Sequence, residues 1–243
     1  MPRFFLPEIS AGSRFLTLTG EAAQHAKVLR LRPGEAVTVC DGKGIDYACT
    51  VSDVSPGQYS LVVHNEGPSG SEPKVLASVY MAFAKADKLE PVIQKATELG
   101  ASEIVAFPSA RCVSKPDEKA LAKKLERWAK IVASAAEQSG RGVIPAVLAL
   151  GSWREALERA AQAELPVFFY ENERARTFHD ALSAGSFASC ALMTGPEGGF
   201  SPEEVADAAA AGMCVCTLGS RILRCETAPL CALSALMYAC GEF

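Results

Sequence analysis

Two glycine-containing segments near the C-terminus hold the residues best suited to binding a ligand. The first reads TGPEGGFSPEE (Thr194–Glu204), and the second reads LGSRILRCETA (Leu218–Ala228). Each segment follows a short apolar run typical of a buried strand and precedes a pattern typical of a helix. Because loops that follow neighbouring parallel strands meet at one edge of an α/β sheet, we expect both segments to line one pocket.

The composition of the first segment argues against a phosphate ligand. Ser201 and Glu204 have the spacing of a capping box, and Pro202 suits the first helical position, so side chains already occupy the helix N-terminus. Glu197 would repel a phosphate, and neither glycine motif typical of nucleotide binding is present. We therefore expect a neutral or cationic ligand. The alternative is a tight strand-to-helix turn that binds nothing.

The second segment combines apolar and charged side chains. Ile222 and Leu223 are suited to covering a flat ring. Arg224 and Glu226 are suited to facing a substrate or to pairing with each other. Taken alone, Arg224 is also compatible with an ordinary surface salt bridge, and the sequence leaves both roles open.

The pattern of apolar residues that positions these segments changes near residue 70. Before it, short stretches alternate with period two and are separated by turn signals, which predicts a small β-barrel-like domain over residues 1–70. A polar stretch rich in Gly, Pro and Ser, His64–Pro73, is the expected linker. The expected elements here are strands Arg14–Leu18, Ala36–Cys40, Tyr47–Val54 and Tyr59–Val63, with a helix at Glu21–Leu31.

After the linker, apolar runs alternate with helical stretches over residues 73–243. This alternation predicts an α/β domain with a parallel sheet and helices on both faces. Gly100 is expected just beyond the end of the first helix. The expected strands are Val75–Ala84, Glu103–Pro108, Leu165–Tyr170, Ser189–Thr194 and Met213–Leu218. The expected helices are Asp87–Leu99, Asp117–Ser139, Trp153–Ala163, Pro202–Ala211 and Thr227–Cys240.

Composition excludes several classes of function. Nine scattered cysteines without a C-x-x-C pair and only three histidines predict reduced core thiols and no metal site. The sequence contains no apolar run long enough to span a membrane, and no signal peptide is apparent. We therefore expect a cytoplasmic protein. The formal net charge is −4. Basic residues nevertheless outnumber acidic ones in residues 1–32 and 111–130, which fits either an RNA-facing surface or a solvated helix face.

Five motifs in order along the chain resemble those of the SPOUT methyltransferases that modify N3 of a uridine in 16S ribosomal RNA. One departure is Cys225, where threonine is expected. The motifs cover most of the chain and are His25–Arg30, Ile93–Gly100, Ala136–Arg141, Gly195–Ser201 and Leu218–Ala228.

The resemblance implies an α/β fold with a knotted parallel sheet, that is, a C-terminal trefoil knot, and a PUA-like RNA-binding domain at the N-terminus. It implies S-adenosylmethionine as cofactor and a homodimer whose sites use residues of both subunits. The implied substrate is the uridine at position 1498 of 16S rRNA in the assembled small ribosomal subunit. A ribosome assembly factor without catalysis, and a related methyltransferase acting on transfer RNA, are the alternatives.

The resemblance also implies roles for individual residues. For catalysis, Arg224 would stabilise negative charge on the uracil oxygens, and Glu197 or Glu226 would act as the base or orient an arginine. The expected cofactor-binding residues are Tyr170, Thr194, Gly195, Pro196, Glu197, Gly199, Leu218, Gly219, Ile222, Leu223, Arg224, Thr227 and Ala228. The expected RNA-binding residues are Arg3, Arg14, Lys27, Arg30, Lys88, Arg111 and Arg141.

Overall fold

The computed structural model describes residues 1–10, 12–85, 88–114 and 116–243, which form two compact units. The first unit comprises residues 1–72 and 136–144, and the second comprises residues 73–135 and 145–243. The sequence predicts residues 136–144 in the second domain. The structure groups them with the first unit because the Glu72 carboxylate binds the backbone amides of Gly142 and Val143 at 2.8 and 3.1 Å.

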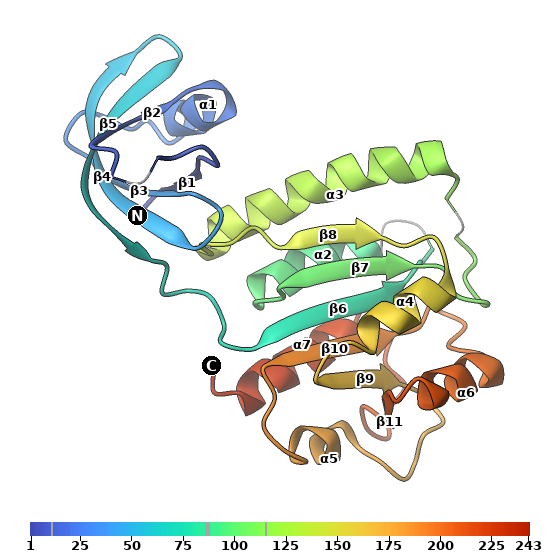
Figure 1. The fold of residues 1–243 in the computed structure, drawn as a ribbon. Coiled ribbons are helices and arrows are strands. Elements are labelled where there is room, and N and C mark those ends of the chain that lie inside the picture. Colours follow the sequence, from blue (N-terminus) through green and yellow to red (C-terminus); the bar gives the residue numbers. More distant parts are fainter. Residues whose placement is uncertain (11, 86–87, 115) are drawn as a thin grey trace. The chain divides into compact units, whose positions relative to one another are not determined.

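The first unit is a curled five-stranded sheet with the order β1-β3-β4-β5-β2 and one helix, α1 (Gly20–Val28) (Figure 1). The β1–β3 pair is parallel and the other pairs are antiparallel. Two register irregularities between β4 and β5 increase the local twist, which favours the curl. The strands are β1 (Arg3–Phe5), β2 (Phe15–Leu18), β3 (Ala36–Cys40), β4 (Ile45–Ser55) and β5 (Gln58–Pro68).

One sequence prediction for this unit is wrong, and one strand was not predicted. The expected linker began at His64, but β5 continues to Pro68 and pairs as far as Ile45 of β4. A polar strand is possible there because its backbone, and not its side chains, makes the ladder. The short strand β1 was not predicted because three residues are too few for a recognisable period.

The second unit is a six-stranded, entirely parallel sheet with the order β11-β9-β10-β6-β7-β8. Its strands are β6 (Leu76–Ala82), β7 (Glu103–Phe107), β8 (Ala146–Ala149), β9 (Leu165–Phe169), β10 (Ser189–Thr194) and β11 (Cys214–Cys216). Its helices are α2 (Leu89–Glu98), α3 (Glu118–Ser139, whose last turn belongs to the first unit), α4 (Trp153–Ala160), α5 (Phe178–Leu182), α6 (Pro202–Ala210) and α7 (Ala228–Ala239).

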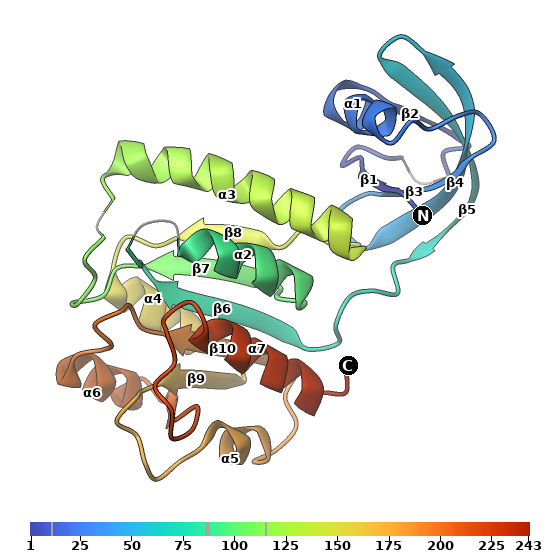
Figure 2. The same ribbon diagram turned by 180° about the vertical axis from the view of Figure 1, so that it is seen from behind.

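Helices cover both faces of this sheet, as the sequence predicts. Figure 1 shows α4 in front of the sheet, and Figure 2 shows α2 and α7 against the opposite face. Trp153 at the start of α4 packs on Phe168 and Phe200 and donates from Nε1 to Asp207 of α6 at 3.2 Å. Aromatic side chains therefore cover the sheet on the face where α4 packs.

Most elements predicted after the linker are confirmed to within a few residues. Asp87, the expected start of α2, lies outside the described residues. The strand expected at Met213–Leu218 is shorter, and its last residues belong to the loop that follows it. Strand β8 and helix α5 were not predicted, since both are short and α5 is started mainly by its Thr177–Asp180 capping box.

The strand order places the loops of interest together. Strand β10 lies between β6 and β9, so the chain changes direction across the sheet at the β6–β10 boundary. Such a topological switch point separates the loops at the carboxyl ends of the strands and opens a crevice there. The two segments identified from sequence follow β10 and β11 and therefore meet at this edge.

The nine cysteines are free thiols, and most of them are buried. Among the helices that the structure describes, none is both long and apolar enough to span a membrane.

Gly100 provides a test of the fold. Its φ is +95° just after α2, and a Cβ at this position would lie 2.6 Å from Pro73 Cγ and 3.3 Å from Met237 Cε. Gly100→Ala should lower the free energy of unfolding by about 2–3 kcal/mol, from the left-handed backbone and the collision together. Denaturant unfolding measures this change.

Gly212→Ala is the matched control, because Gly212 also ends a helix with positive φ, +83°, but no atom lies within 4 Å of its Cβ position. It should cost only about 1 kcal/mol. Equal losses in the two variants would contradict a packing role for Gly100.

Candidate functional site

A cavity of about 510 Å³ opens at the carboxyl edge of the parallel sheet. Its walls come from the last residues of β9 and β10, from the residues that follow β9, β10 and β11, and from Lys88, just before α2. Most of the expected cofactor-binding residues line it: Tyr170, Thr194, Gly195, Pro196, Glu197, Gly199, Leu218, Gly219, Ile222, Leu223, Arg224 and Ala228. Thr227 and Glu226 do not belong to the lining.

The sequence analysis missed part of the wall. The further lining residues are Lys88, Phe169, Glu171, Gly198, Thr217, Arg221 and Cys225. Position offered a usable signal for Glu171, because it directly follows the expected strand Leu165–Tyr170, and for Thr217, because it lies at the carboxyl end of the expected strand Met213–Leu218. No local signal identified Lys88 as a pocket residue, since it precedes both glycine-containing segments by more than one hundred residues.

The first loop is fixed by its glycines and its cap. Gly199 has φ +65°, and a Cβ there would collide with the Glu171 carboxylate. The predicted capping box is confirmed: Ser201 N–H donates to Glu204 at 2.8 Å, and Glu204 N–H donates to Ser201 Oγ at 3.2 Å. The same buried Glu204 accepts from the Ala110 amide at 2.8 Å, so the loop after β7 holds α6 in place.

Glu197 is anchored from the segment that follows β6. Its carboxylate accepts from the backbone amide of Lys85 at 2.9 Å and lies 3.4 Å from Lys88 Nζ. Burial alone would raise the pKa of Glu197, but backbone amides and the Lys88 ammonium outweigh it and lower the pKa. Glu197 is therefore a carboxylate anion.

Glu226 is held by its neighbours Cys225 and Lys88. The Cys225 thiol donates to Glu226 Oε2 at 3.1 Å, and Lys88 Nζ lies 3.4 Å from the same oxygen. The thiol hydrogen bond and the ammonium lower the pKa of Glu226. Burial raises the pKa of Cys225 to about 12, so the thiol keeps its proton.

The lowered pKa values make Glu197 and Glu226 weak bases. A general base works best with a pKa near the working pH, and both carboxylates shift away from it. Each carboxylate is an anion suited to accepting a hydrogen bond or holding a cation, and the role of base expected for one of them stays a prediction.

Arg224 lines the cavity with a side chain that lacks a carboxylate partner among the described residues, as Arg221 on the same wall does. The Arg224 side chain is exposed, and the described residues place no carboxylate within ion-pair distance of it. Its backbone carbonyl accepts from the amides of Thr227 and Ala228 at 2.9 and 3.0 Å, which fixes the main chain at the start of α7. Arg224 thus has a fixed backbone and a guanidinium free to meet a substrate.

Four of the seven expected RNA-binding residues already have partners. Arg3 binds Asp46 with two hydrogen bonds, and the almost fully buried Arg141 binds Glu72 at 2.6 Å. Lys88 lies in the cavity between two carboxylates, and Arg111 Nη1 donates to the carbonyl of Gly198 at 3.0 Å.

These pairings divide the seven residues by how available they are to an RNA phosphate. Contact with an RNA phosphate is disfavoured for Arg3, Arg141 and Lys88, because each would have to leave a carboxylate. Arg111 keeps free donors after contacting Gly198, and the side chains of Arg14, Lys27 and Arg30 are exposed. Lys115, part of the expected basic stretch, lies outside the described residues.

The cavity wall carries charges of both signs beside apolar surface. Glu171 and Glu197 place carboxylates on it, and Leu218, Ile222 and Leu223 supply apolar surface. The cationic lining residues are Lys88, Arg221 and Arg224. Among the described residues, no group of three or more His, Cys, Asp and Glu side chains is arranged to hold a metal. The carboxylates and apolar side chains fit the neutral or cationic ligand expected from the sequence.

Comparison with known proteins identifies the family. A family model described as an RNA methyltransferase domain matches residues 71–237, and an RNA methyltransferase PUA domain matches residues 18–63. The chain is 36% identical to the ribosomal RNA small subunit methyltransferase E of Bacillus subtilis, over 98% of this chain and 96% of that protein. The chain belongs to the ribosomal RNA small subunit methyltransferase E family.

Solved structures agree with this assignment. The Neisseria gonorrhoeae member, crystallised with S-adenosylmethionine, is 34% identical with a TM-score of 0.85, covering 98% of this chain and 97% of that one. A methyltransferase of Legionella pneumophila in complex with the same cofactor is 31% identical with a TM-score of 0.84, over 98% and 97% of the two chains. The expected enzyme class, RNA methyltransferase, and the PUA-like first domain are confirmed.

The charges around Lys88 predict a pH dependence of stability. Because the folded-state pKa values of Glu197 and Glu226 are lowered from 4.5, their pairing with Lys88 contributes fully above that pH and is lost as the pH falls through the lowered values. The difference in unfolding free energy between wild type and Lys88→Met should be constant from neutral pH down to about pH 5 and shrink below it.

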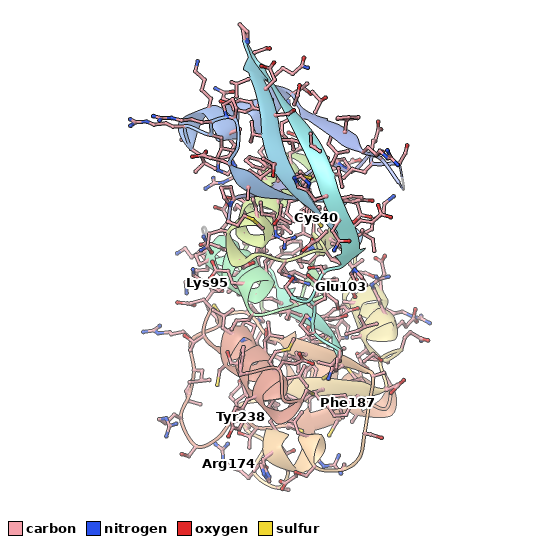
Figure 3. The ribbon with its side chains drawn as sticks, turned by 90° about the vertical axis from the view of Figure 1, so that its left-hand side faces the viewer. Cys40, Lys95, Glu103, Arg174, Phe187 and Tyr238 are labelled. Carbon is pink, nitrogen blue, oxygen red and sulfur yellow. The ribbon has the colours of Figure 1, made fainter. Side chains whose placement is uncertain are left out.

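Urea unfolding across this pH range tests the prediction. Lys95→Met is the control, since Lys95 pairs with Glu98 on the exposed surface of α2 (Figure 3) and should show little difference at any pH. A Lys88→Met difference that is independent of pH would contradict the assigned pairing.

Proposed function

We propose that this protein transfers a methyl group from S-adenosylmethionine to N3 of a uridine in 16S rRNA of the assembled small ribosomal subunit. By family the target is position 1498, and the protein would act in the cytoplasm. The observation that carries the proposal is the cavity at the strand switch point, walled by the same two loops that define the family resemblance. Relatives crystallised with the cofactor support it.

The residues of the cavity fit this cofactor. When bound, S-adenosylmethionine supplies an electrophilic methyl group on a positively charged sulfonium. Carboxylates at Glu171 and Glu197 favour the cation, and Leu218, Ile222 and Leu223 offer apolar surface for the adenine ring. Tyr170, Thr194–Gly199 and Gly219 would supply backbone donors and acceptors, with Thr227 and Ala228 closing the site.

The substrate base would enter flipped out or single-stranded, because N3 lies on its pairing edge. Methyl transfer to N3 also requires loss of the N3 proton. Arg224, whose guanidinium has no carboxylate partner among the described residues, would stabilise negative charge that develops on a uracil oxygen. Exposed Arg14, Lys27, Arg30 and Arg111, with the other basic residues of the 111–130 stretch, would hold the RNA backbone.

We also propose the homodimer and the trefoil knot implied by the resemblance, with domains at residues 1–70 and 73–243. Helix α7 carries no charged residue, yet Tyr238 (Figure 3) is 76% exposed. Cys231 of the same helix is also exposed. An apolar helix with an uncovered side is typical of a surface that a second copy covers. Sedimentation of the purified protein at several concentrations tests the dimer.

Two experiments separate the proposal from its alternatives. Small subunits from a strain lacking the protein, incubated with the pure protein and cofactor, should gain one N3-methyluridine, detected by mass spectrometry of the RNA. Methylation of transfer RNA instead would favour a different methyltransferase. Absence of both methylation and calorimetric cofactor binding would favour a non-catalytic assembly factor.

Gly199→Ala should weaken cofactor binding. The new Cβ would collide with Glu171 at a residue whose φ is +65°, so the loop must shift out of the geometry that forms the cavity wall. We expect the cofactor Kd to rise at least about tenfold in calorimetry. Gly185→Ala, where no atom lies within 4 Å of the Cβ position, is the control and should bind like wild type.

Arg224→Ala should abolish methylation while cofactor affinity changes less than about tenfold, the size of one lost polar contact. The reason is that the guanidinium would act on the substrate base and not on the cofactor. Single-turnover methylation and calorimetry measure the two effects separately. Undiminished turnover would remove Arg224 from the mechanism.

A further inference from the structure

Lys88 occupies a position that helix stability does not explain. It is the N-cap residue of α2, and its side chain makes no capping hydrogen bond. An N-cap favours a short side chain that accepts a hydrogen bond, and the positive end of the helix dipole repels a cation. Lys88 therefore destabilises the start of α2 in both respects. Contacts with residues outside α2 offset this cost.

These contacts form a cluster assembled from three separate segments. Lys88 Nζ lies 3.4 Å from Glu197 in the loop after β10, 3.4 Å from Glu226 before α7, and 3.8 Å from the Cys225 sulfur. The Lys88 side chain is still 33% exposed, and both Lys88 and Glu197 line the cavity. A donor and an acceptor therefore stand side by side on the wall.

The charge states of the cluster are settled by its contacts. Nearby groups raise the pKa of Lys88 despite the opposing effect of desolvation, so the amine is an ammonium. Glu197 and Glu226 are anions and Cys225 is a neutral thiol. The cluster thus carries one net negative charge, which disfavours a phosphate and suits a neutral group with both an acceptor and a donor.

The pairing edge of uracil has this pattern. Its carbonyl oxygen O4 accepts a hydrogen bond, and the adjacent N3–H donates one. Cytosine presents the reverse, an amino donor beside an N3 acceptor, and would place its acceptor against a carboxylate. A site built for one pattern rejects the other because its own polar groups would stay unpaired.

We infer that Lys88 and Glu197 read the imide edge of the target base, with Lys88 donating to O4 and Glu197 accepting from N3–H. The inference rests on the proposed uridine methylation. Glu226, held by the Cys225 thiol, keeps Lys88 oriented and does not touch the base. Uracil O2, the second carbonyl, is left to Arg224.

This arrangement also explains how the proton on uracil N3 is removed. As the bond from N3 to the methyl carbon forms, the carbon–sulfur bond breaks and its electron pair returns to sulfur as a neutral thioether. Before that bond forms, Glu197 takes the N3 proton and later releases it to water. Even a weakly basic carboxylate can take this proton, because Lys88 stabilises the negative charge that its loss places on O4. Formation of the bond from N3 to carbon cancels this charge, so the methylated base is neutral.

The test compares Lys88→Met and Lys88→Arg with wild type in single-turnover methylation of small subunits at saturating cofactor, from about pH 6.5 to about pH 8.5. In Lys88→Met the rate at neutral pH should fall about a hundredfold or more, and cofactor Kd should change less than about threefold. The remaining rate should rise about tenfold per pH unit, because reaction then requires a uracil already ionised by solvent. Lys88→Arg should restore most of the rate and a flatter profile.

Lys95→Met on the same helix is the control and should match wild type. A Lys88→Met enzyme with the wild-type rate, or with weaker cofactor binding but an unchanged rate at saturation, would overturn the inference and leave Lys88 as a link between loops. The proposed function fails separately, if wild type itself places no methyl group on uridine N3. In that case the inference falls with it.

Discussion

The insertion of β10 between β6 and β9 in a wholly parallel sheet is the constraint on which the candidate site depends. Parallel pairing sends the carboxyl ends of all these strands to one edge, and the change of direction at the β6–β10 boundary leaves a crevice there. Segments beginning at residues 83, 170, 195 and 217 therefore meet, although up to about 130 residues separate them. No single loop of the chain could form this wall.

The loops at that edge are held rigid by contacts behind the cavity. Glu204 caps α6 and also binds the amide of Ala110, while Arg111 fixes the carbonyl of Gly198. Phe200 stacks on Phe168 with ring centroids 4.2 Å apart. Because the glycine-rich loop is anchored on both sides, its backbone groups can be presented to a ligand without being ordered at the moment of binding.

The ion pairs that each charged residue forms, more than the net charge, decide which charges at the site are available to a ligand. Lys88 neutralises part of the charge of Glu197 and Glu226 and draws the two loops together, whereas Arg224 keeps its guanidinium free of carboxylates among the described residues. Arg3 and Arg141 show the opposite outcome, since each is taken up by an acidic partner in the first unit. Basic residues that look equivalent in the sequence thus divide into paired and available groups.

The sequence by itself determined the longer helices and strands and most of the cavity wall. Strands such as β10 and the Ser201–Glu204 cap were predictable because their patterns are local, and five motifs in order along the chain indicated the family. Pairing across the fold was not predictable: the place of Lys88 between two carboxylates, the burial of Arg141 on Glu72 and the approach of Glu171 to Gly199 join residues far apart in the chain. Only the tertiary structure decided these, because a side chain's partner depends on which strands lie side by side, and strand order leaves no local pattern in the sequence.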